Sequence, residues 1–301
     1  MDRRNFLKIA TYTGLGMFKG CHEYHSRSMG NDEKRKKVLI LGLDGCRPDA
    51  LEKAYTPSID SLISEGLYSP IAQAGSHTIS GPGWSNILCG VWEEKHGVID
   101  NTFKGSRYCR YPSMFTRIKQ YDQSYLTGSA VTWPNINKNI VRSADYLLTN
   151  NWKLSEQRKS VAESVDVLEG MIDLMFVYFM QPDNAGHAYG FSPNVNRYVS
   201  AIENVDQQVE KILDAVRSRP SYHQEDWLTI LISDHGGKGR SHGRQSPEEK
   251  NIPFLLHGTS VVKDSFKEPP TQVDVFPTVF AHLGVPINPQ WGLQGKVVGV
   301  R

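Results

Sequence analysis

The sequence predicts an α/β protein in which helices cover both faces of a mostly parallel sheet. Three apolar runs, at residues 36–45, 173–180 and 227–236, have the length and continuity of strands that are buried on both faces. Segments with helical patterns separate these runs. Strands and helices that alternate along a chain favour a three-layer αβα sandwich.

Helix signals lie between and after these runs. Residues 56–66 begin with Thr-Pro, which suits a helix start, and end with glycine. Residues 194–219 place isoleucines and valines three and four positions apart, which predicts an amphipathic helix. We also expect helices over 155–171 and 273–284, the second broken or bent at Pro277.

Other segments have weaker patterns. Residues 124–133 and 252–258 are further strand candidates. Residues 97–123 have no clear period, and we expect them to form a small excursion from the sheet.

The composition is that of a soluble globular protein with a substantial core. The chain has 301 residues, of which 39% are hydrophobic and 22% charged. Residues 1–37 carry nine of the 34 basic side chains and four of the 32 acidic ones, so the remainder is mildly acidic. This distribution argues against electrostatic binding of a nucleic-acid polymer.

The amino-terminal segment predicts export. Residues 1–21 resemble a twin-arginine signal built on Arg3 and Arg4, and their apolar stretch is too short to span a membrane. Cys21 resembles a lipoprotein site, so a lipid anchor is an alternative. Residues 22–35 read as a polar linker and 36–301 as the folded domain, which we expect to be periplasmic or on the cell surface.

The remaining cysteines show no CxxC or zinc-finger spacing. We expect Cys46 and Cys89 to be buried free thiols, with a pair between them as the alternative.

Side chains that commonly bind metals follow three of the predicted strands. Three are aspartates and three are histidines: Asp44, Asp183, His187, Asp234, His235 and His242. Each alone could be a turn or cap residue. Because ligands of open α/β sheets bind beyond the carboxyl ends of the strands, we expect one shared site there. Mixed carboxylate and imidazole ligands suit zinc better than manganese or iron.

The segment TISGPGWSNILCG raises the question of a nucleophile. Its glycines and apolar run predict a helix with Ser80 at the amino-terminal end. Backbone N–H groups and the helix dipole there would stabilise an alkoxide and a phosphoryl oxygen. A plain capping serine is the alternative.

Four ordered motifs carry a family resemblance. GLDGCRPD, TISGPGWSNILCGVWEEKHGVIDN, QPDNAGHAYG and SDHGGKGRSHG together resemble the alkaline phosphatase superfamily, and within it the nucleotide pyrophosphatase/phosphodiesterase (type I phosphodiesterase) branch. The resemblance covers residues 36–300. It implies an alkaline-phosphatase-like sandwich that hydrolyses phosphodiester or pyrophosphate bonds of small molecules with two zinc ions.

The resemblance also implies roles for the metal ligands. One zinc site would be Asp183, His187 and His242, and the other, which would also contact Ser80, would be Asp44, Asp234 and His235. His242 lies closer to the Asp-His-Gly motif than in many relatives, so His257 competes for its role.

The nucleophile and its neighbours follow from the same resemblance. Ser80 lies ten residues before Gly90, the distance expected for a nucleophile that forms a phosphoseryl intermediate, with Thr78 as the alternative. The branch usually has Thr followed by Phe-Pro-Asn, so Ser-Gly-Pro-Gly is a departure. Asn101 and the backbone N–H of Gly81 would hold phosphate oxygens.

The substrate is left open. Trp84, Trp133 and Tyr189 are candidates for stacking on a base, although packing roles are the alternative. A phosphomonoesterase, a phosphonate hydrolase, a phosphoryl transferase, and a non-catalytic surface protein that binds metal or a phosphoryl ligand are rival functions. A sulfatase is disfavoured because Trp84 stands where that chemistry needs arginine. The sequence does not indicate an oligomeric state.

Overall fold

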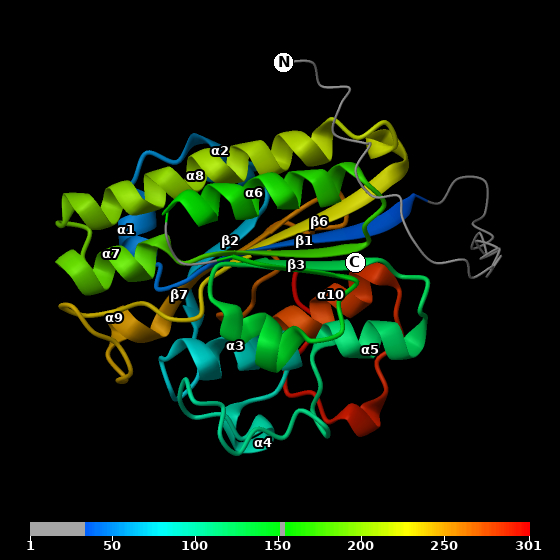
Figure 1. Ribbon diagram of the computed structural model, residues 1–301, viewed down its shortest axis with the longest axis horizontal. Helices are drawn as coiled ribbons and strands as arrows, with labels where there is room; N and C mark the ends of the chain where they lie inside the picture. Colours follow the sequence, from blue (N-terminus) through cyan, green and yellow to red (C-terminus); the bar gives the residue numbers. More distant parts are fainter. Residues whose placement is uncertain (1–33, 151–153) are drawn as a thin grey trace, which may run out of the picture.

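Seven strands form one sheet through the middle of the molecule, in the order β2-β7-β6-β1-β5-β3-β4 (Figure 1). The computed structural model describes residues 34–150 and 154–301. Neighbouring strands are parallel, except that β7 runs antiparallel to both β6 and β2. The strands are β1 (Arg35–Leu43), β2 (Leu67–Gln73), β3 (Thr127–Val131), β4 (Tyr146–Thr149), β5 (Leu174–Phe179), β6 (Glu225–Ile232) and β7 (Asn251–His257).

Helices cover both faces of the sheet and complete the predicted three-layer αβα sandwich (Figure 1). One layer holds α1 (Pro48–Lys53), α2 (Pro57–Glu65), α6 (Leu154–Glu169), α7 (Gln181–Tyr189) and α8 (Asn196–Arg217). The other holds α3 (Ser80–Cys89), α5 (Met114–Tyr121) and α10 (Val275–Leu283), with α4 (Glu93–His96) beyond them. The short helix α9 (Pro247–Lys250) precedes β7.

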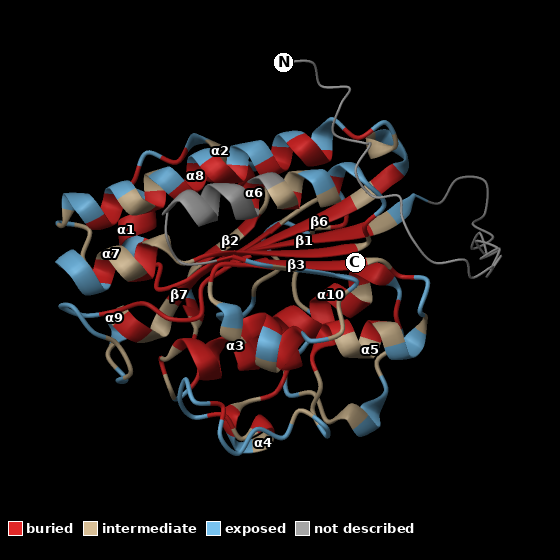
Figure 2. Ribbon diagram, viewed as in Figure 1, coloured by how far each residue is buried: buried red, intermediate tan, exposed pale blue. Residues whose placement is uncertain are grey.

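Alternate side chains of the central strand β1 enter two separate cores. Val38 and Ile40 belong to the core on the α3 side, whereas Leu39 and Leu41 belong to the core on the α8 side. Successive strand residues point to opposite faces, so a strand covered on both faces is apolar at every position. Figure 2 shows the central strands buried between the two layers. This packing explains the continuous apolar runs of the sequence.

The apolar pattern predicted the central strands and missed the two at the edges. β2 contains Pro70, which cannot donate to a strand ladder, and its pairing with β7 shifts between Ser69 and Ala72. β4 has only four residues. The segment 97–123 leaves the sheet, as predicted, and contains α5.

The expected break at Pro277 is wrong. α10 runs from Val275 to Leu283, and Pro277 is its third residue. The N–H groups of a first helical turn have no intrahelical partner, so proline costs no hydrogen bond there.

Cys46 and Cys89 are buried free thiols, as expected, and lie in the cores on opposite faces of the sheet. The predicted export signal, with Cys21, lies outside the described residues, and so does the predicted linker up to residue 33. Within the described ranges, no helix is long and apolar enough to cross a membrane.

Candidate metal centre

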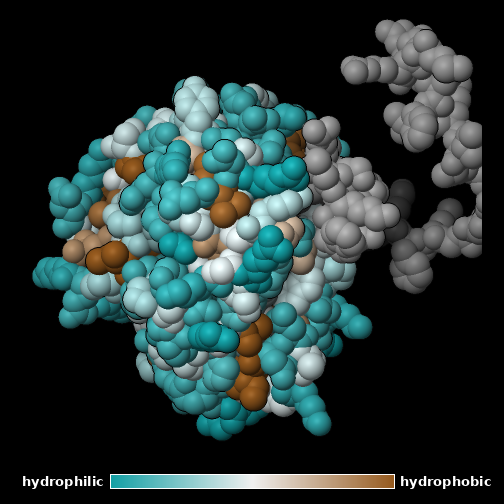
Figure 3. Space-filling view, turned by 90° about the vertical axis from the view of Figure 1, so that its left-hand side faces the viewer, coloured by the Kyte–Doolittle hydropathy of each residue, from teal (hydrophilic) through white to brown (hydrophobic). Residues whose placement is uncertain are grey.

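Three adjacent strands, β5, β1 and β6, end together at the carboxyl end of the sheet. The residues that follow them, the loop after β6 and the start of α3 form one cluster there. Its members are Asp44, Ser80, Asp183, His187, Asp234, His235 and His242. Figure 3 faces this end of the molecule, where hydrophilic side chains predominate and apolar ones form separate patches.

The first predicted set of ligands converges. Asp183 Oδ1 lies 3.5 Å from Nε2 of His187 and 3.5 Å from Nε2 of His242. The two Nε2 atoms are 3.0 Å apart. Asp183 and His187 are four residues apart on α7, so they project from the same face of that helix. One ion could therefore contact all three atoms.

The second predicted set converges beside the first. His235 Nε2 lies 3.3 Å from Asp234 Oδ2 and 3.7 Å from Asp44 Oδ1. Ser80 Oγ is 3.3 Å from the same nitrogen. The rings of His235 and His242 stack with centroids 3.8 Å apart, and the ligand atoms of Asp183, His235 and His242 also lie within 4.8 Å of one another. The two sets thus adjoin through the stacked histidines.

Each histidine is held by a backbone carbonyl behind it. The Nδ1–O distances are 3.0, 2.8 and 2.8 Å for the pairs His187–Arg240, His235–Gly236 and His242–Thr78. A ring nitrogen that faces a carbonyl carries the proton, so Nε2 keeps its lone pair and faces the cluster. This arrangement is common for metal-binding histidines.

The carboxylates of the cluster lack cationic partners. Asp44, Asp183 and Asp234 are buried, and each has an oxygen without a hydrogen bond: Oδ1, Oδ1 and Oδ2, respectively. In the part of the chain that the structure describes, no lysine or arginine forms an ion pair with them. Buried charges without partners cost several kcal/mol. The donor set therefore fits divalent cations, and neutral imidazoles with carboxylates suit zinc.

Burial favours the neutral form of these aspartates and of two of the histidines. Burial raises the pKa of Asp44, and burial together with the charge of Asp44 raises the pKa of Asp183 and Asp234 well above the usual range. Burial also lowers the pKa of His235 to about 4 and that of His242 to about 3. His235 and His242 are thus neutral near pH 7 and provide no positive charge for the carboxylates.

Ser80 is the first residue of α3, as predicted, but it is not the capping residue. Ile79 occupies the cap position, so the Ser80 hydroxyl is not needed there and faces His235. Gly83, one turn later, allows the close approach of α3 to β6, because a Cβ at Gly83 would lie 2.8 Å from the carbonyl oxygen of Asp234. The glycine at position 83 thus allows α3 to pack close to Asp234, which places Ser80 beside the cluster of aspartates and histidines.

Asn101 and Gly81 contact each other. The Gly81 N–H donates to Asn101 Oδ1 at 2.7 Å. We expected this N–H to hold a phosphate oxygen, but the hydrogen bond to Asn101 already occupies it. The Asn101 side chain is exposed, and its Nδ2 donates to no group among the described residues. The Nδ2 group of Asn101 is therefore available as a donor, and the Gly81 N–H orients the amide.

The structure contradicts the expected substrate contact of Trp84. Its side chain is fully buried beneath the cluster, and Nε1 donates to Asp44 Oδ2 at 3.0 Å. Tyr178 donates to the same oxygen at 2.6 Å. Sequence reasoning missed Tyr178 because it lies within the apolar run of β5, where only its hydroxyl distinguishes it from a core residue.

The alternative residues for the site are placed elsewhere. Thr78 is buried, with its hydroxyl donating to the Arg244 carbonyl and accepting from the Gly243 N–H, so it holds the loop that carries His242. His257 belongs to neither ligand set, because its Nε2 faces Glu65 Oε2 at 3.5 Å.

The other two stacking candidates differ in accessibility. Trp133 is half-buried and packs against Phe103, with ring centroids 5.9 Å apart. Tyr189, at the end of α7, is 44% exposed and its hydroxyl accepts from Arg197.

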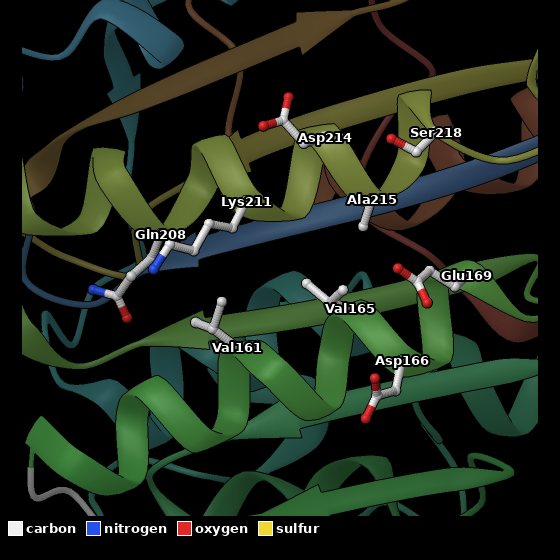
Figure 4. A pocket seen from close by; sticks show the side chains of 9 residues that line it. All are labelled: Val161, Val165, Asp166, Glu169, Gln208, Lys211, Asp214, Ala215 and Ser218. Carbon is white, nitrogen blue, oxygen red and sulfur yellow. The ribbon is translucent and has the colours of Figure 1, made fainter. Parts of the chain in front are cut away.

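A separate groove of about 510 Å³ lies between α6 and α8. Figure 4 shows Val161 and Val165 of α6 on the side that faces α8. The groove contains none of the residues of the metal-type cluster, so it is distinct from the candidate metal centre.

Comparisons with known proteins found one matching family model and several relatives. The family model described as type I phosphodiesterase / nucleotide pyrophosphatase matches residues 38–246, a range that contains every residue of the cluster. Ectonucleotide pyrophosphatase/phosphodiesterase family member 7 of Mus musculus is 25% identical over 227 residues, which cover 68% of this chain and 50% of the relative. A pyrophosphatase/phosphodiesterase of Schizosaccharomyces pombe is 24% identical over 231 residues, 69% of this chain and 46% of the relative.

The chain thus spans about half the length of the curated relatives that it matches. Among solved structures, murine ectonucleotide pyrophosphatase / phosphodiesterase 5 is similar with a TM-score of 0.70 and 17% identity, over 84% of this chain and 96% of that one. A 2-O GAG sulfatase is similar with a TM-score of 0.68 and 15% identity, over 88% of this chain and 73% of that one. These likenesses show the alkaline-phosphatase-like fold.

Proposed function

The chain belongs to the type I phosphodiesterase / nucleotide pyrophosphatase family, and we propose that it is a metal-dependent hydrolase of phosphodiester or pyrophosphate bonds. Ser80 is the nucleophile in this proposal. The observation that carries it is the position of Ser80 Oγ, 3.3 Å from His235 Nε2, where two sets of metal-type ligands adjoin. A hydroxyl at a helix amino terminus, beside unpaired buried carboxylates, suits phosphoryl chemistry.

Two zinc ions complete the proposed site. Asp183, His187 and His242 would hold one ion, and Asp44, Asp234 and His235 the other. When bound, the ions would supply positive charge that lowers the pKa of a hydroxyl and stabilises the oxygens of the transferred group. The remaining steps belong to the chain's own residues.

Ser80 Oγ, having lost its proton to solvent, forms a bond to phosphorus, and the bond from phosphorus to the leaving oxygen breaks, with the leaving oxygen taking the electron pair and then a proton from solvent. The product of this step is a phosphoseryl residue at position 80. Water then attacks phosphorus, the bond to Ser80 Oγ breaks, and the serine takes back a proton. Asn101 Nδ2 would donate to a non-bridging oxygen throughout, oriented by the contact of its Oδ1 with the Gly81 N–H. A neutral amide suits the single charge of a diester.

We propose small phosphodiesters or pyrophosphates as substrates. One solved relative, murine ectonucleotide pyrophosphatase / phosphodiesterase 5, is described in complex with AMP, which supports testing nucleotides first. Tyr189 is the exposed aromatic residue at the end of α7 that could contact a base. We further propose export to the periplasm or cell surface through residues 1–21, with a lipid anchor at Cys21 as the alternative.

The test compares two model substrates with the full chain purified in the presence of zinc. We would measure kcat/KM for bis-p-nitrophenyl phosphate and for p-nitrophenyl phosphate, with Ser80→Ala as the matched control. We expect a preference for the diester and a loss of at least about a thousandfold in Ser80→Ala, with both zinc ions retained.

Other outcomes would redirect the proposal. A preference for the monoester would indicate a phosphomonoesterase on the same site. Turnover that survives Ser80→Ala would refute the nucleophile. Zinc binding without turnover of either substrate would favour a phosphonate hydrolase, a phosphoryl transferase or a non-catalytic binding protein.

A further inference from the structure

The two carboxylate oxygens of Asp44 have different surroundings. Oδ2 accepts two hydrogen bonds, from the Tyr178 hydroxyl at 2.6 Å and from Trp84 Nε1 at 3.0 Å. Oδ1 accepts none, although it is buried, and lies 3.7 Å from His235 Nε2. The hydrogen bonds therefore lie on the side of Asp44 that faces the core, and the oxygen without partners faces the cluster.

The two donors are fixed in place by packing. Trp84 and Tyr178 are at most 1% exposed, and their rings meet edge to face with centroids 5.4 Å apart. Phe176 packs against Trp84 at the same centroid distance. Gly42 of β1, two residues before Asp44, makes room for the indole, because a Cβ there would lie 2.5 Å from the Trp84 ring. The sheet is thus shaped to place this indole beneath Asp44.

Asp234 follows the same pattern with a backbone donor. Its Oδ1 accepts from the Gly45 N–H at 3.1 Å, and its Oδ2, which has no hydrogen bond, lies 3.3 Å from His235 Nε2. In both aspartates one oxygen is used to orient the side chain and the other points to the same histidine nitrogen. Asp44 differs in that its donors are side chains, which can be changed one at a time.

We propose that Trp84 and Tyr178 are positioning residues that hold Asp44 through Oδ2, so that it binds metal through Oδ1 alone. This inference rests on the proposed function, since it takes Asp44 as a ligand. A carboxylate without these donors could turn about its side-chain bonds and present either oxygen or both. Partners that orient a metal ligand typically change metal affinity by about 10-fold to 100-fold when removed.

The experiment measures zinc binding rather than turnover. Metal-free full chain would be titrated with zinc against a competing chelator, and the bound zinc counted by mass spectrometry. Tyr178→Phe removes one hydroxyl and keeps the ring, and Trp84→Phe removes the other donor. Tyr125→Phe is the matched control, because its hydroxyl is also buried but donates to the Leu283 carbonyl, away from the cluster.

We expect Tyr178→Phe to weaken the binding of one of the two zinc ions by about 10-fold to 100-fold and to leave the binding of the other unchanged. Trp84→Phe should weaken the same ion, and Tyr125→Phe should match the wild type. The inference would be overturned if Tyr178→Phe bound each zinc ion as tightly as the wild type does. It would also be overturned if the variant bound both ions more weakly by the same factor. Thermal melting of the metal-free proteins shows whether Trp84→Phe has also lost packing. If it has, the zinc affinity of Tyr178→Phe alone decides the inference.

The failure of this inference differs from the failure of the proposed function. Wild type that binds two zinc ions without hydrolysing any diester would refute the hydrolase and leave the zinc titration valid. Wild type that hydrolyses the diester, with Tyr178→Phe unaltered in zinc affinity, would refute the positioning role alone. Wild type that binds no zinc would refute both.

Discussion

The two ends of the sheet handle buried charge in opposite ways. At the amino end, the Arg219 guanidinium donates to both oxygens of Glu225, at 2.8 and 2.7 Å, and also to the carbonyls of Leu168 and Gly170. Both side chains are buried. At the carboxyl end, three buried aspartates have no lysine or arginine partner among the described residues. One end completes its charges within the chain, and the other needs cations from outside.

This difference separates the residues that stabilise the fold from those that serve the site. In a buried pair with all its hydrogen bonds formed, removal of one partner is strongly destabilising, because the other charge is left without compensation. A cluster of unpaired buried carboxylates is destabilising as it stands, so the rest of the fold must compensate for it. The contrast has measurable consequences, of which the response to metal removal should be the strongest.

Removal of metal should destabilise the carboxyl end. With free zinc at 100 times each dissociation constant, two sites would add about 5 kcal/mol to the free energy of unfolding, at about 2.7 kcal/mol for each site. Thermal melting with zinc and with excess chelator measures this difference. Asp234→Asn should show a smaller difference, because it retains one complete set of ligands. Equal melting temperatures with and without chelator would contradict the prediction.

Breaking the ion pair at the amino end should destabilise the protein whether metal is bound or not. Arg219→Met leaves the buried Glu225 carboxylate without its partner, which typically costs about 3–5 kcal/mol. Urea denaturation measures the change. Lys296→Met is the control, because Lys296 and Glu268 form an exposed pair, whose loss should change the stability little. Similar losses in both variants would mean that burial does not distinguish the two pairs.

The fold at the sheet centre could be predicted because burial on both faces leaves a continuous apolar run. The edge strands could not, since β2 contains Pro70 and β4 is four residues long. The direction of β7 was also hidden, because an apolar run such as residues 252–256 is the same for either direction. Its antiparallel pairing depends on contacts between strands distant in sequence.

The candidate site divides in a similar way. The ligand-type residues were visible because polar side chains directly follow buried strands, as Asp44 and Asp234 do. The residues behind them were hidden because they belong to apolar segments. The sequence suggests a substrate contact for Trp84 and gives no signal for Tyr178, since only the folded structure places both beside Asp44 Oδ2.

The pH dependence of the metal-free protein should have opposite signs at the two ends. At the carboxyl end, burial and the neighbouring charge of Asp44 raise the pKa of Asp234 well above its ordinary 3.8. The folded state then binds a proton that the unfolded state has lost, so the stability from this group is complete below about pH 3.8 and is lost as pH rises through the folded pKa.

At the amino end, burial opposes ionisation of Glu225, but hydrogen bonds from Arg219, Trp227 and Ser221 outweigh it and lower the pKa from 4.5 to about 2. Its stabilising effect is present above pH 4.5 and is lost as pH falls toward 2. Melting temperatures of metal-free protein between pH 2 and 8 test both signs. The advantage of Asp234→Asn over wild type should grow with rising pH, and the deficit of Glu225→Gln should shrink with falling pH. Two parallel profiles would show that the chain does not treat the charges at its two ends differently.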